Sequence, residues 1–90
     1  MKKALISVTG LDATGIIARV AMKLYELNIN ILDITQTILG GYFTMMMVVD
    51  LEKMTASFGE VVDACDALGR ELGVSIRIQR EEIFNAMHEV

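Results

Sequence analysis

The spacing of hydrophobic residues changes several times along the chain, and each change marks a new element. Residues 3–9 alternate apolar and polar positions, which predicts a strand. Its apolar positions are Ala4, Ile6 and Val8. From Ile16 onward apolar residues recur at helical spacing, with charged residues on the other side. The chain therefore opens with a strand and an amphipathic helix.

The middle of the chain predicts a hairpin. Residues 30–39 are rich in β-branched side chains, which favour a long strand. Gly40 and Gly41 follow, and both tolerate the positive φ that a two-residue hairpin turn needs. The returning strand covers residues 42–50, and it is apolar on both faces.

A second helix and a last strand complete the domain. Ser57 and Glu60 have the Ser-x-x-Glu spacing of a capping box, and the helical pattern runs from there to Gly73, a good terminator. Residues 74–79 alternate again and predict a fourth strand. The tail from Glu81 has apolar residues at helical spacing, which predicts a short third helix.

This order, βαββαβ, predicts an α+β domain of the ferredoxin-like sandwich type. Right-handed crossovers give an antiparallel sheet of order 4-1-3-2 with both helices on one face. We expect one domain over residues 1–80 and a C-terminal helical extension over residues 81–90. The amphipathic extension is expected to cover the apolar second face of the sheet, in its own subunit or across a dimer.

The two edges of this sheet differ. The fourth strand carries Arg77 and Arg80, whereas the second, residues 30–39, has no Pro, Lys or Arg and is apolar on both sides. A bare strand of that kind is a template for pairing with another chain. We therefore predict a homodimer, with an interface that includes Ile31, Leu32, Ile34 and Gln36.

Composition supports association and narrows the function. The chain has 90 residues and is 53% hydrophobic, more than one small core needs, which favours a buried interface. A single cysteine, Cys65, suits a reducing compartment, so a cytoplasmic location is expected. The net charge of −4 argues against a nucleic-acid surface, and no apolar run is long enough to cross a membrane.

Residues for catalysis are scarce. His88 is the only histidine and stands in the tail, while Cys65 falls on the apolar stripe of the second helix. One of each cannot supply a zinc site, and no nucleophile and base can be paired. The sequence predicts a protein that is not an enzyme and holds no cofactor.

The glycine loop, residues 10–15, is the most informative segment for binding. Glycines allow close backbone approach to a ligand, and the N–H groups at a helix start can donate to a carboxylate or phosphate. The alternative is a tight turn in which Asp12 or Thr14 caps the helix. Asn28 and Asn30 likewise fit either turn chemistry or, for Asn30, a polar ligand contact.

Several segments together resemble the ACT domain. They are Asp12-x-x-Gly15-Ile-Ile, then Val20, Leu24 and Asn28-Ile-Asn30-Ile31 leading into a strand with Gln36. The chain is most similar to the small stand-alone ACT proteins of bacteria and archaea. That closer similarity is carried by Ile34-Thr-Gln-Thr-Ile38, Tyr42-Phe-Thr-Met-Met46 and Ile83-Phe-Asn-Ala-Met87.

The resemblance implies a regulatory module that binds an amino acid or another small ligand at a dimer interface. The implied site lies between the first strand–helix loop of one subunit and the start of the second strand of its partner. By position it would be lined by Gly10, Leu11, Asp12, Thr14, Gly15, Ile16, Ile17 and Asn30. Amino-acid-sensing members often have an uncharged polar residue near Asp12, and an acid there suits a ligand ammonium or a helix cap.

Other functions remain as alternatives. The dimer could act as an interaction module that regulates a partner enzyme without binding a ligand. An acylphosphatase-like enzyme would need an arginine in the glycine loop, which has none. An RNA-binding sheet would need stacking aromatics among basic residues, and the first strand has no aromatic residue.

Overall fold

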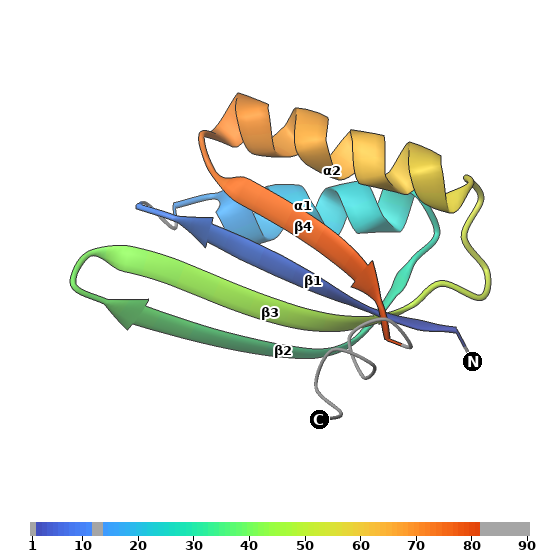
Figure 1. The fold of residues 1–90 in the computed structure, drawn as a ribbon, viewed down its shortest axis with the longest axis horizontal. Helices are drawn as coiled ribbons and strands as arrows, with labels where there is room; N and C mark the ends of the chain where they lie inside the picture. The colour runs from blue at the N-terminus through green and yellow to red at the C-terminus, as the bar shows by residue number, and fades with distance from the viewer. Residues whose placement is uncertain (1, 12–13, 82–90) are drawn as a thin grey trace, which may run out of the picture.

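The computed structural model describes residues 2–11 and 14–81. It contains two helices and one four-stranded antiparallel sheet, in the order β2-β3-β1-β4. Both helices lie on one face of the sheet (Figure 1). The elements are β1 (Lys3–Gly10), α1 (Ile16–Glu26), β2 (Asn30–Leu39), β3 (Tyr42–Asp50), α2 (Phe58–Leu72) and β4 (Ser75–Arg80). The predicted fold and sheet order are confirmed, since 4-1-3-2 is the same order in reverse.

The core lies between the sheet and the two helices. The inward residues of β1 and β3 are fully or almost fully buried, as the alternating pattern predicts. They are Ala4, Ile6, Val8, Phe43, Met45, Met47 and Val49. The helices add Ile16, Val20 and Leu24 from α1 and Val61, Cys65 and Leu68 from α2. Burying each large side chain contributes about 1.5–3 kcal/mol.

The register fixes which residues lie at each end of the sheet. Lys3 of β1 and Asn30 of β2 both pair with Asp50 of β3, whereas Gly10 pairs with Phe43 at the opposite end. A β-bulge interrupts the pairing of β2 with β3 between Ile31 and Asp33. Beyond the bulge, residues of β2 again alternate between the helix-covered and the open face.

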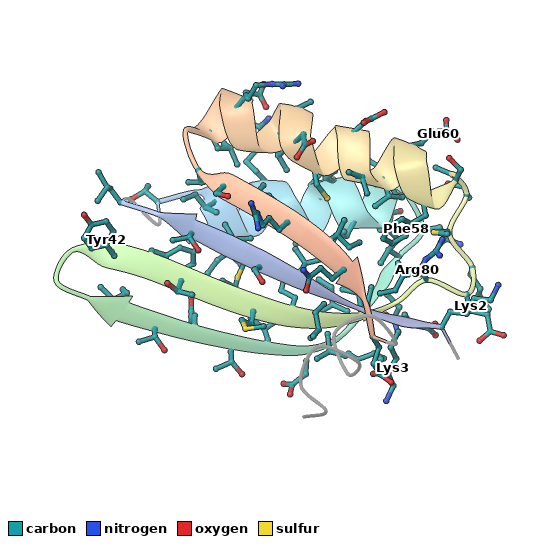
Figure 2. The ribbon with its side chains drawn as sticks, viewed as in Figure 1. Lys2, Lys3, Tyr42, Phe58, Glu60 and Arg80 are labelled. Carbon is teal, nitrogen blue, oxygen red and sulfur yellow. The ribbon has the colours of Figure 1, made fainter. Side chains whose placement is uncertain are left out.

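The second helix begins with the predicted capping box. The backbone N–H of Glu60 donates to Ser57 Oγ at 3.2 Å, and the backbone N–H of Ser57 donates to Glu60 Oε1 at 3.0 Å. The helix ends at Gly73, whose φ of 72° is left-handed. Arg80 at the end of β4 stacks over the ring of Phe58, 4.4 Å from its centroid, and so joins the last strand to this helix (Figure 2).

The first helix has no side-chain cap at its N-cap residue. That residue is Gly15, not Asp12 or Thr14, and its φ of 75° is left-handed. Asp12, one of the two suggested capping residues, lies outside the described residues.

Of the predicted C-terminal helix, residues 81–90, the part from residue 82 onward lies outside the described residues. Across the residues that the structure does describe, neither helix has the length and apolar character needed to span a membrane.

Candidate ligand-binding site

The glycine loop requires glycine at each of its two ends, for different reasons. At Gly10 the chain passes so close to Val74 that an added Cβ would lie 2.4 Å from Val74 Cγ1. At Gly15 there is open space, and the residue is needed for its positive φ instead. The loop therefore needs glycine at both ends, once for space and once for conformation.

The start of α1 offers backbone donors. The first N–H groups of a helix have no acceptor within it, and the first turn of α1 contains no acidic residue. Ile16 is buried at 3% exposure, whereas Leu11 and Ile17 are exposed nearby. Together with the helix dipole, these donors favour a negatively charged group.

Asn30 does not join these residues within one chain. Gly10 and Asn30 lie at opposite ends of the sheet, as the register shows. β1 is eight residues long, and a rise of about 3.3 Å per residue places its ends roughly 23 Å apart. A small ligand in one subunit cannot contact both groups.

The predicted interface residues lie along the outer edge of β2, which no other strand in the described part of the chain covers. Leu32 and Ile34 are 40% and 41% exposed, and Ile38 is 70% exposed. Gln36 is exposed, whereas Ile31 is half-buried and packs against the core. The edge is thus open and exposes these apolar side chains, although Asp33, Thr35 and Thr37 between them are polar and exposed.

The neighbouring flank of α1 is also apolar. Arg19 forms an ion pair with Glu71 of α2, which marks the flank of α1 that faces the other helix. Ile17 and Tyr25 fall on the opposite flank, toward β2, and Tyr25 is 79% exposed. The exposed apolar surface therefore continues from the strand edge onto the first helix.

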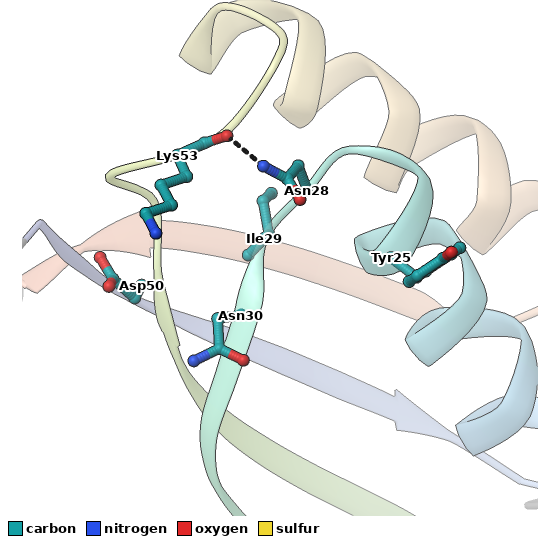
Figure 3. A pocket seen from close by; sticks show the side chains of 6 residues that line it. All are labelled: Tyr25, Asn28, Ile29, Asn30, Asp50 and Lys53. Atoms are coloured by element: carbon teal, nitrogen blue, oxygen red, sulfur yellow. Dashed lines mark hydrogen bonds between the residues drawn. The ribbon is translucent and has the colours of Figure 1, made fainter.

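A pocket of about 300 Å³ lies where α1 ends. We call it the α1-end pocket. It is lined by Tyr25, Asn28, Ile29, Asn30, Asp50 and Lys53 (Figure 3). Of these, the sequence singled out Asn28 and Asn30 alone. For Asp50 and Lys53, the signal available in the sequence was an acid at the predicted end of the third strand, followed by a lysine three residues later.

The described residues offer little reactive chemistry. Cys65 is 4% exposed, as its place on the apolar stripe predicts. Burial, and secondarily the neighbouring Asp66, raises the pKa of its thiol to about 11, so it stays protonated. Over residues 2–11 and 14–81 no group of His, Cys, Asp and Glu is arranged to hold a metal ion. His88 lies outside the described residues.

Known proteins resemble this chain over almost its whole length. A UPF0237 protein of Listeria innocua is 54% identical over 88 residues, which cover 98% of this chain and 99% of that protein. A UPF0237 protein of Methanocaldococcus jannaschii is 41% identical and covers both chains completely. Among solved structures, an ACT domain protein from Streptococcus pneumoniae is 44% identical with a TM-score of 0.83, covering 92% of this chain and 93% of that one.

The family model agrees with these relatives. A model described as ACT domain matches residues 2–79, which include all six elements of the fold except the last residue of β4. The chain belongs to the ACT domain family and, within it, to the small UPF0237 proteins.

Proposed function

We propose that this protein is a non-catalytic, cytoplasmic regulatory module that binds a small molecule, such as an amino acid, as a homodimer. ACT domains are in general regulatory modules that bind small molecules. The ligand would lie between the glycine loop of one subunit and the start of β2 in the other. The observation that carries the proposal is the bare apolar edge of β2.

Pairing two copies of β2 would bring the separated halves of the site together. In an antiparallel pair related by a two-fold axis, the start of one strand lies beside the end of the other. The end of β2 is at the same end of the sheet as Gly10. The partner's Asn30 would therefore approach the glycine loop, and the site would be complete only in the dimer.

A variant that breaks the strand pair tests this proposal. Replacing Ile34 with Lys places a charge on the bare edge, so we expect sedimentation velocity to show a folded monomer. Ala67→Lys, on the exposed surface of α2, is the matched control and should stay dimeric. Isothermal titration with the twenty amino acids and with purine nucleotides then asks whether the dimer binds a ligand that the monomer does not. A monomeric wild-type protein at micromolar concentration would overturn the proposal.

The second candidate is an interaction module that regulates a partner enzyme without a ligand. It is favoured by the other sheet edge, where a groove of about 230 Å³ opens between α2 and β4. Apolar Val62 and Ile76 line this groove beside Arg77, and no other strand in the described residues pairs with the outer edge of β4. A partner strand with an acidic residue would fit. Affinity capture with wild-type protein and with Arg77→Glu, compared for the same retained enzyme, tests this alternative.

A further inference from the structure

The face of the sheet opposite the two helices, the open face, has an apolar centre. Its side chains come from alternate positions of the strands. The pairing places Leu5 of β1 beside Val48 of β3, and Met46 is the next open-face residue along β3. Met46 is 37% exposed, and Leu5 and Val48 are half-buried. Among the described residues no helix covers this surface (Figure 1).

Polar and charged residues surround the apolar centre. Lys3 and Asp50 are paired at one end of the open face, and Thr9 pairs with Thr44 toward the other. On the flanking strands, Arg77 of β4 and Asp33 of β2 are exposed. An apolar centre within a polar rim is the usual anatomy of a contact surface.

The chain leaves the sheet beside this surface. Arg80, the last residue of β4, pairs with Ala4, the neighbour of Leu5 in β1. Glu81 follows with a helical backbone, and residues 82–90 lie outside the described residues. The apolar residues of that segment recur at helical spacing and are Ile83, Phe84, Met87 and Val90.

We propose that residues 82–90 form a short helix that lies across the open face of their own subunit, with its apolar side on Leu5, Met46 and Val48. The lengths match. At about 1.5 Å per residue, a helix over these residues is about 14 Å long. Neighbouring strands lie about 4.8 Å apart, so the path from β4 across β1 and β3 to β2 is also about 14 Å. The segment therefore spans the apolar centre from its starting point on β4.

The charges along this path are complementary. Glu82 begins the segment near β4 and β1, where Arg77 and Lys3 are exposed. Neither cation forms an ion pair with another described residue. His88 comes near the end of the segment, on the side of β2, where Asp33 is exposed. Opposite charges thus meet at both ends of the segment.

The own subunit is favoured over a second copy because the segment follows β4 directly. A contact made by a directly attached segment has the high effective concentration of an intramolecular step, so a second copy would have to displace it. With the open face covered, the outer edge of β2 is the exposed apolar surface left for association. The contact does not use that edge and therefore does not depend on the proposed dimer.

A spin label on the segment tests the contact in the full chain. Asn85→Cys places a thiol on the polar side of the helical pattern. Cys65 is buried and its thiol has a pKa of about 11, so at neutral pH the label attaches to the new thiol. We expect strong broadening of the Leu5 and Val48 methyl signals in NMR spectra. The methyl signals of Val61, buried on the other side of the sheet, should broaden much less. Equal broadening at the three residues would overturn the contact.

A mixed sample separates the two occupants of the open face. Spin-labelled protein without isotopes is mixed with isotope-labelled, unmodified protein, and we expect no broadening at Leu5. Broadening in this mixture would mean that the segment of a second copy covers the face, which overturns the own-subunit contact. A monomeric wild-type protein that still shows the intramolecular broadening would overturn the proposed dimer and support this contact.

Two neighbouring substitutions test the apolar side of the segment. Phe84→Ser removes its largest apolar side chain, and Asn85→Ser on the polar side is the matched control. Phe84→Ser should shift the methyl signals of Leu5 and Val48 and raise the fluorescence of an apolar dye roughly threefold, because the apolar centre becomes exposed. Asn85→Ser should do neither, and circular dichroism checks that both variants fold. An equal response in the two variants, or none in Phe84→Ser, would contradict the proposal.

Discussion

The two helices of this domain begin in opposite ways. At α2 the side chains of Ser57 and Glu60 bond backbone N–H groups in both directions, so the start of the helix is satisfied by its own sequence. At α1 the N-cap is Gly15, which has no side chain, and the first turn has no acid. The start of α2 is therefore capped by side chains, whereas the N-cap residue of α1 contributes no side-chain bond.

The connections that lead into the helices differ in the same way. The segment before α1 depends on two glycines, one confined by Val74 and one in a left-handed conformation. The segment before α2 depends on side-chain bonds. The comparison teaches that the start of α2 depends on side-chain bonds, whereas the approach to α1 depends on glycine at two positions. Substitutions in each segment can therefore test the two requirements separately.

The largest effect is expected from Gly10→Ala. The new Cβ would lie 2.4 Å from Val74 Cγ1, and overpacking of this kind costs about 2 kcal/mol of unfolding free energy. Urea denaturation measures the loss. Adding Val74→Ala to Gly10→Ala removes the clashing methyl group, so the two changes should not be additive. Strict additivity in this double-mutant cycle would show that the close approach is not the reason for Gly10.

The next effect is expected from Gly15→Ala. A non-glycine residue at a φ of 75° costs about 1–1.5 kcal/mol, because its Cβ crowds the backbone in the left-handed region. Gly15→Asn should cost clearly less, since Asn adopts this conformation more readily. Thermal unfolding of the two variants checks the ranking. Equal losses would point to lost space at Gly15 and contradict the open surroundings of its missing Cβ.

The sequence predicts one helix start well and the other poorly, for a physical reason. The capping box lies within four consecutive residues, so its spacing can be seen without a structure. At α1 both Asp12 and Thr14 have capping chemistry, and nothing in the sequence reveals that Gly15 is left-handed. The fold, its sheet order and the bare β2 edge could be predicted because hydrophobic periodicity dominates them.

The α1-end pocket could not be predicted for a different reason. Asn30 and Asp50 meet only through the register of β2 and β3. Lys53 is brought to them by the bond from Asn28 and by the contact of Thr55 with Leu27, which are tertiary contacts. Local periodicity carries no information on such pairs, so nothing in the sequence linked Asn30, a suggested ligand contact, to Asp50 or Lys53.

A smaller effect is expected from Ser57→Ala, which tests the self-satisfied helix start. Removing the hydroxyl leaves the N–H of Glu60 without its acceptor and should cost about 1 kcal/mol. Ser57→Asp keeps an acceptor at the cap and should retain most of the stability. Urea denaturation is the measurement, and ligand binding should not change. A Ser57→Asp variant as unstable as Ser57→Ala would argue against the cap as the source of the effect.

The smallest effect is a pH dependence of the same cap. The backbone N–H of Ser57, and then its hydroxyl, lower the pKa of the Glu60 carboxyl in the folded state. The unfolded chain has the ordinary value, so this contribution is present above the ordinary range and is lost as the pH falls through the folded pKa. Wild type should therefore exceed Glu60→Gln in stability at about pH 7 and lose that advantage by about pH 3. Because Glu60 is fully exposed, the difference will be small, and carboxyl titration followed by NMR is the more sensitive measurement. In Ser57→Ala the pKa of Glu60 should rise toward its ordinary value. An unchanged pKa of Glu60 in that variant would show that the Ser57 hydroxyl does not contribute to the shift.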